Sequence, residues 1–217
     1  MKPPTFEIKV ALLGHVSVGK TTLLNALLGD KFSEVSKGRT TAGITHFSVS
    51  PILVPTVENL KDTGNKGIND DSYSPALALK KITADNLNLR KQSQIHECTL
   101  NVEVDKPLVS MLPSTNLVIT EIPGVNEAGT SEMYLDFVKK SWDTFDCAVV
   151  VMDAAQGVNT DEQVRLLQFV KNNLKENKDV PVIILCNKVD DADDEELISL
   201  VDEVRNKVEN IFDVSYK

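Results

Sequence analysis

Eight residues near the N-terminus, Gly14 to Thr21, read GHVSVGKT and fit the G-x-x-x-x-G-K-[ST] pattern of a phosphate-binding loop. Glycines in such a loop let the backbone turn its N–H groups inward around phosphate oxygens, and Lys20 supplies a positive charge for the terminal phosphates. The Thr21 hydroxyl is a ligand for magnesium, and the next helix points its positive end at the anion. The pattern therefore predicts nucleotide-phosphate binding; the alternative is an inert glycine-rich turn. The predicted contacts are Gly14, His15, Val16, Ser17, Val18, Gly19, Lys20, Thr21 and Thr22.

A second polar group follows an apolar run late in the chain, where NKVD occupies 187–190. A carboxylate at Asp190 can accept hydrogen bonds from both N1–H and the exocyclic amine of guanine. Adenine cannot supply that pair and would leave the carboxylate unsatisfied, so the contact discriminates strongly. We predict that Asn187, Lys188 and Asp190 bind the guanine end of a nucleotide. The alternative is a solvated loop leading into the acidic run at 190–196.

Two further segments could complete the chemistry around a γ-phosphate. EIPG at 121–124 ends an apolar run, so we predict that Glu121 faces magnesium and that Gly124 offers its N–H to the γ-phosphate. GRTTAG at 38–43 carries two threonines, and a threonine hydroxyl from a mobile loop commonly completes the magnesium shell at such sites. We favour Thr41 over Thr40 for that role. Arg39 is either a charge stabiliser in cis or, as we favour, a solvated side chain.

These motifs need a scaffold that brings their loops to one edge, and the hydrophobic pattern predicts one. Short apolar runs at 8–13, 117–122, 146–152 and 180–186 are typical of buried strands, whereas 20–28, 160–171 and 195–212 have helical spacing. Strands that alternate with amphipathic helices indicate an α/β fold with a mostly parallel sheet and helices on both faces, a three-layer P-loop NTPase architecture. Loops at the carboxyl ends of such strands bind ligands.

The stretch 51–115 departs from this rhythm, because it is polar and too long for a plain connection. We predict an insertion at the antiparallel edge of the sheet, with a loop near 61–75, a helix within 76–92 and a strand at 98–104. Residues 1–217 are then expected to form a single extended domain.

The composition indicates a soluble globular chain: 217 residues, 41% hydrophobic and 25% charged. A net charge of -9 disfavours nucleic acid and anionic membranes as partners. The N-terminus lacks an apolar signal region, and no apolar run approaches the ~20 residues of a membrane span. Cys98, Cys147 and Cys186 lack metal spacing, and we interpret them as small core residues of a reducing compartment. We expect Trp142 to pack in the core or to make a helix-face contact. We expect a cytoplasmic protein.

Several runs together resemble the dynamin-type GTPase domain: 14–29, the threonine pair at 40–41, EIPGV at 121–125, DCAVVVMDAAQ at 146–156 and 182–190. The separate motifs are generic to GTPases. The resemblance is narrowed to the dynamin superfamily by three features: the NALLG ending at 25–29, the proline at 123 and the long insertion. It covers roughly 6–212 and is weakest at 51–95.

The resemblance implies a GTPase that binds GTP or GDP and hydrolyses GTP to GDP and phosphate with Mg2+. It implies catalytic roles for Lys20, Ser17, Thr41 and Gly124, and a metal set of Thr21, Thr41 and Glu121. Ser17 matches a position that helps hold a charge-compensating cation, so Na+ or K+ dependence is implied. A homodimer across the nucleotide face is implied as well.

Three departures from the family pattern matter. Glu121 stands where an aspartate is usual, and its extra methylene must be absorbed by the strict octahedral geometry of magnesium. Val16 and Val125 are apolar at positions that orient the attacking water in related proteins, which leaves backbone groups, His15 or a partner chain for that task. The chain ends about where a last strand should begin and carries no stalk or membrane-binding segment, so we expect a fragment whose membrane contacts would lie in other regions.

Three functions therefore compete. The leading hypothesis is a Mg2+-dependent GTPase whose hydrolysis is slow or is activated by dimerisation. The second is a GTP/GDP-binding switch or scaffold with little hydrolysis, which Glu121, Val16 and Val125 favour. The third is a translation-factor-like GTPase, suggested by GHV at 14–16 and GIT at 43–45 but opposed by the acidic charge.

Overall fold

The computed structural model describes residues 6–28, 43–49, 57–58, 97–102, 115–125, 131–176, 179–191 and 193–214. Within these ranges seven strands form one sheet in the order β3-β4-β2-β5-β1-β6-β7. The strands are β1 (Phe6–Leu13), β2 (Ile44–Val49), β3 (Val57–Glu58), β4 (Glu97–Val102), β5 (Thr115–Glu121), β6 (Cys147–Asp153) and β7 (Val182–Asn187). The helices are α1 (Lys20–Leu28), α4 (Ser131–Ser141), α5 (Asp161–Glu176) and α6 (Glu195–Phe212), with a 3-10 turn η1 at Trp142–Thr144.

The sheet is parallel through its centre and mixed at one edge. β5, β1, β6 and β7 run parallel to one another, which places the segments that follow them at one end of the sheet. β2 is antiparallel to β5, β4 is parallel to β2, and β3 is antiparallel to β4. The strand predicted at 98–104 is β4, and it lies beyond β2 at that edge. The loop and helix predicted for 61–75 and 76–92 fall outside the described residues.

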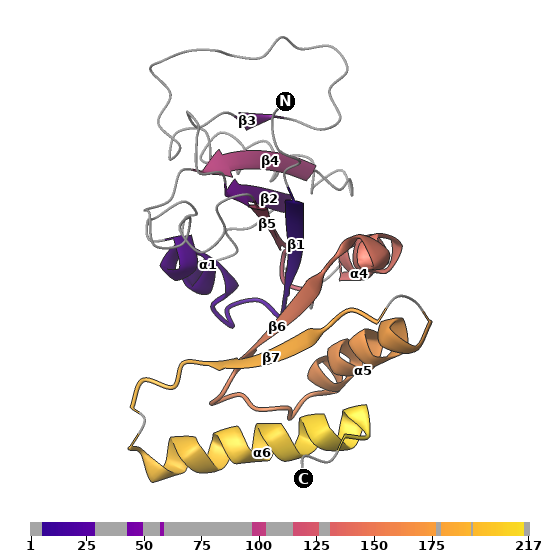
Figure 1. The fold of residues 1–217 in the computed structure, drawn as a ribbon. Helices are drawn as coiled ribbons and strands as arrows, with labels where there is room; N and C mark the ends of the chain where they lie inside the picture. The colour runs from indigo at the N-terminus through magenta and orange to yellow at the C-terminus, as the bar shows by residue number, and fades with distance from the viewer. Residues whose placement is uncertain are drawn as a thin grey trace.

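Helices cover both faces of the sheet, as the sequence pattern predicts. Figure 1 shows α1 on one side of the strands and α4 and α5 on the other, with α6 next to α5. Successive side chains of β1 point to opposite faces of the sheet and so pack against both helical layers. Leu12 packs with Leu24 of α1, whereas Ala11 and Leu13 pack with α4 and α5. The fold is therefore the three-layer α/β architecture expected for a P-loop protein. No helix in the described ranges is both long and apolar enough to cross a membrane.

Helix α4 was not predicted from the sequence, in which no helix was assigned between the apolar runs at 117–122 and 146–152. Only Tyr134 and Val138 are buried on it, one turn apart, so its apolar stripe is short. The other sequence features that favour a helix here are charges that suit the helix dipole. Glu132 lies in the first turn, and Lys139 and Lys140 lie in the last.

Trp142 lies between α4 and β6 and is fully buried in the cluster under α4 and α5, as predicted for a core residue. We expect Trp142→Ala to lower the free energy of unfolding by about 3–5 kcal/mol, because a large cavity replaces a complete set of contacts. The measurement is urea unfolding followed by circular dichroism, since this is the sole tryptophan and its fluorescence is lost. A loss below about 1 kcal/mol would contradict the packing described.

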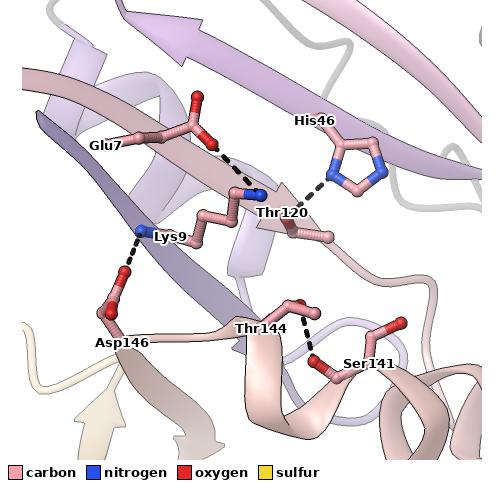
Figure 2. A network of polar contacts seen from close by, with 7 residues as sticks. All are labelled: Glu7, Lys9, His46, Thr120, Ser141, Thr144 and Asp146. Carbon is pink, nitrogen blue, oxygen red and sulfur yellow. Dashed lines mark hydrogen bonds and ion pairs between the residues drawn. The ribbon is translucent and has the colours of Figure 1, made fainter. Parts of the chain in front are cut away.

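β1, β2 and β5 carry polar side chains on the α4 face (Figure 2). Asp146 Oδ2 accepts from Lys9 N–H at 3.0 Å, which joins the start of β6 to β1. His46 Nδ1 is 2.9 Å from Thr120 Oγ1, and its Nε2 is 4.0 Å from Glu97 Oε2 on β4. His46 is thus part of the sheet surface and largely buried.

His46 gives the fold a pH dependence whose sign follows from its burial. Burial lowers the pKa of His46 below 6.5, Lys9 acts in the same direction, and Glu97 partly offsets both. The unfolded chain then takes up the proton first, so stability falls as the pH drops from about 6.5 to the lowered native pKa. We expect His46→Gln to lose less stability than the wild type between pH 7.5 and 5, measured as urea midpoints. Equal losses in both chains would rule out this contribution.

Candidate nucleotide-binding site

The loop between β1 and α1 has the backbone shape of a cradle. Gly14, Ser17 and Gly19 have positive φ angles of 148°, 64° and 98°. A Cβ on Gly14 would lie 2.5 Å from the carbonyl oxygen of Val151 on β6, so no other residue fits there. The loop is thereby pressed against the carboxyl end of the sheet, where the N-terminus of α1 points at it. Of the predicted contacts here, Val18 packs its side chain into the core, and Thr22 is exposed.

Lys20 spans this loop from the first turn of α1. Its Nζ donates to the carbonyl oxygens of Gly14, at 3.0 Å, and His15, at 2.8 Å. Burial lowers the pKa of Lys20 to about 8, while the nearby Glu121 carboxylate acts to raise it. The structure thus places a buried cation at the centre of the loop, held by two weak acceptors that phosphate oxygens could replace.

Glu121 meets the loop from the neighbouring strand. It ends β5 and is 1% exposed, and its Oε1 accepts from the Thr21 hydroxyl at 2.5 Å. These residues are 100 positions apart in the chain. Two hard oxygen donors, one of them a buried carboxylate, are suited to Mg2+, which is usually held by one or two side chains together with phosphates and water. The longer side chain of Glu121 reaches the hydroxyl that an aspartate at this position would approach less closely.

The segment after β5 lies directly on the phosphate loop. Ile122 N–H donates to Leu12 O at 3.2 Å and Val125 N–H to Gly14 O at 3.4 Å, while the Ser131 hydroxyl donates to Val125 O. Val125 is 4% exposed and packs in the cluster under α4 and α5.

Gly124 is the point of closest approach between these two loops. A Cβ on it would lie 2.6 Å from Val16 N and 2.8 Å from Val16 Cα, so Gly124→Ala must displace backbone. We expect this change to weaken guanine-nucleotide binding by about tenfold or more and to lower the free energy of unfolding by about 1–3 kcal/mol. Nucleotide titration and urea unfolding test it. Binding unchanged from the wild type would mean that the loops can separate freely.

The guanine motif is tied to the same loop. Asn187 Nδ2 donates to Val18 O at 2.8 Å, and a Cβ on Gly19 would overlap that amide group. Lys188 has a left-handed backbone, φ 63°, and its Nζ lies 2.6 Å from Asp153 Oδ2. Asp190 is exposed beyond them. The structure therefore brings the phosphate loop and 187–190 to one edge and leaves the Asp190 carboxylate open to a ligand.

His15 faces away from the centre of the loop, toward α5. It is 7% exposed, and its pKa is lowered by burial and by Lys20, while Glu162 at the start of α5 raises it. A neutral, buried imidazole in contact with α5 supports the shape of the loop.

Arg39, Thr40 and Thr41 fall outside the described residues, so their assignments stay predictions. Asp153, by contrast, was not singled out by the sequence reading. In the sequence it is a single acid at the end of an apolar strand. Its proximity to the guanine motif becomes visible only from the pairing of β6 with β7.

Comparison with known proteins places this site in a family. The model of the dynamin family matches residues 10–189, which include the phosphate loop, EIPG at 121–124 and the first three residues of the guanine motif. A relative from Acanthamoeba polyphaga mimivirus, described as an uncharacterized protein, is 25% identical over 193 residues, 88% of this chain. The chain spans only 30% of that relative's length.

Solved structures agree on the fold. In an oligomerised bacterial dynamin pair described as sensing and tethering membranes, one chain matches with a TM-score of 0.55 and 19% identity, over 94% of this chain and 31% of that chain. Era, solved with MgGDPNP and a piece of 16S ribosomal RNA, matches with a TM-score of 0.50 and 21% identity, over 94% of this chain and 48% of that chain. The family match together with the fold identifies this chain as a member of the dynamin family that carries its P-loop GTPase domain.

Proposed function

We propose that this domain binds GTP and hydrolyses it to GDP and phosphate with Mg2+. The observation that carries the proposal is the convergence of three motifs on one loop. Lys20 lies at its centre, Thr21 contacts Glu121 of β5, and Asn187 of the guanine motif is bonded to Val18. The loop, the proposed metal donors and the proposed base-reading motif thus lie at one edge of the sheet, which supports the proposal.

Each residue has a task that follows from its position. The backbone N–H groups of 14–19 and the N-terminus of α1 would hold the phosphates, with Lys20 neutralising their charge. Asp190 would accept from guanine, while Asn187 keeps the base-reading loop against the phosphate loop. Phosphoryl transfer needs positioning and charge stabilisation rather than a protein nucleophile, so this set can be sufficient.

Thr21 and Glu121 are the described residues that would hold Mg2+, and Thr41 is the proposed third. Bound there, the ion would neutralise charge that develops on the phosphate oxygens. Ser17, exposed and with positive φ, is the proposed position for Na+ or K+.

Orientation of the attacking water is the weakest point of the site. Val16 packs against Gly124 and Val125 is buried, and neither valine has a side-chain donor or acceptor with which to orient water. The Gly124 N–H and a second copy of the domain across the nucleotide face remain, and we propose that dimerisation stimulates turnover.

The test is GTP turnover by the purified protein with Mg2+, in Na+ and in K+, over a range of protein concentrations. We expect phosphate release per molecule to rise with concentration. GTP binding without turnover under all these conditions would leave the second candidate, a GTP/GDP-binding switch, which the apolar Val16 and Val125 favour.

A further inference from the structure

Asp153 is a buried carboxylate, 4% exposed, to which the proposed function has so far given no role. It is the last residue of β6, the strand between β1 and β7. β1 leads into the phosphate loop and β7 into the guanine motif. A nucleotide that reaches from the loop to the motif must cross the carboxyl end of β6. Asp153 therefore lies below the middle of the ligand, where the nucleoside joins the phosphates.

Both oxygens of this carboxylate have defined partners. Oδ1 accepts from Ala155 N–H at 3.1 Å, within the turn that follows β6, and Oδ2 accepts from Lys188 Nζ at 2.6 Å. The backbone holds the two residues in place, because Asp153 and Asn187 are register partners and Ala154 N–H donates to Asn187 O at 3.0 Å.

The Lys188 side chain is consequently stretched between two strands. It starts in a left-handed backbone after β7, ends at the carboxylate on β6 and is 43% exposed. Its apolar stem thus runs along the edge that the nucleoside would cross, with its charged end already paired.

We propose that Asp153 is a positioning residue of the guanine-nucleotide site, which holds Lys188 across the end of β6 as a preformed platform for the nucleoside. This inference rests on the proposed function. A free lysine would lose rotamer freedom when a ligand orders it, whereas a side chain that is already held loses little. Pairing also neutralises a buried carboxylate that would otherwise repel the phosphates.

A double-mutant cycle with Asp153→Asn and Lys188→Met tests the proposal, using the affinity and dissociation rate of a fluorescent GDP analogue. Asp153→Asn keeps an oxygen for Ala155 N–H and removes the charge that holds Lys188. We expect about tenfold weaker binding from this change, through faster dissociation. In the Lys188→Met background the same change should have little further effect, because the side chain it acts through is gone.

The control variant is Asp136→Asn, which removes an ion pair of equal length, 2.6 Å to Lys140, from the exposed face of α4. It should bind GDP like the wild type. Thermal unfolding of the nucleotide-free variants shows whether Asp153→Asn destabilises the turn after β6, apart from any effect on nucleotide binding. Equal losses with and without Lys188, or no loss from Asp153→Asn, would overturn the proposal. A wild-type protein that binds no guanine nucleotide would instead overturn the proposed function, and with it this inference.

Discussion

Lys20→Ala is expected to weaken binding of GTP and GDP by about 100-fold and to abolish measurable turnover. The Lys20 ammonium is the one cation seen among the described residues inside the loop, and hydrogen bonds to charged groups contribute about 1.5–3 kcal/mol each. The measurement is titration with a fluorescent GTP analogue, followed by phosphate release at saturating GTP. Lys139→Ala, on the exposed surface of α4, is the matched control and should behave like the wild type.

The same variant separates a binding role from a structural one. Burial lowers the pKa of Lys20 to about 8, so at neutral pH the folded protein keeps a charge that its surroundings disfavour. Removing that charge should leave the stability of the nucleotide-free protein unchanged or raised. A variant that loses nucleotide binding only because it unfolds would contradict the assignment of Lys20 to the phosphates.

The phosphate loop and central strands were predictable because their signals are local. A glycine pattern between an apolar strand and an amphipathic helix specifies β1, the loop and α1 within a short stretch, and the helix predicted at 195–212 was correct at both ends. Helix α5 continues to Glu176, past the predicted end at 171, because Asn173 is buried and Leu174 packs against the core as part of a further turn.

What the sequence did not reveal depends on pairing between distant strands. Nothing local indicates that β4 runs parallel to β2, or that Asp153 and Lys188, 35 positions apart, form an ion pair. The contact of Thr21 with Glu121 is equally distant, yet its members could be proposed, because metal chemistry links a hydroxyl and a carboxylate without knowledge of the register. A contact between distant residues could therefore be predicted where a known chemical role links the two groups, whatever their separation in sequence.

Asp190→Asn is expected to change which base the site accepts. Guanine presents two donors, N1–H and the exocyclic amine, and the change replaces one of the two acceptors with an amide that meets that amine donor to donor. Because one hydrogen bond becomes a donor–donor clash and the other loses its charge assistance, GTP affinity should fall by about 1000-fold. Xanthine presents one donor and one carbonyl acceptor at the same edge, which an asparagine side chain can match. Xanthosine triphosphate should therefore bind the variant better than GTP does.

Asp190 is well suited to this test, because it is exposed and the substitution keeps its size, so folding should be unaffected. The measurement is competition of GTP, ATP and xanthosine triphosphate against a fluorescent nucleotide, with thermal unfolding of the free protein beside it. Asp193→Asn changes another exposed acid three residues on; this matched control should keep the wild-type preference. An unchanged ratio of GTP to xanthosine triphosphate affinity in Asp190→Asn would remove the base-reading role from this carboxylate. In that case 187–190 would serve the phosphate loop through Asn187 alone, and guanine selectivity would have to arise elsewhere.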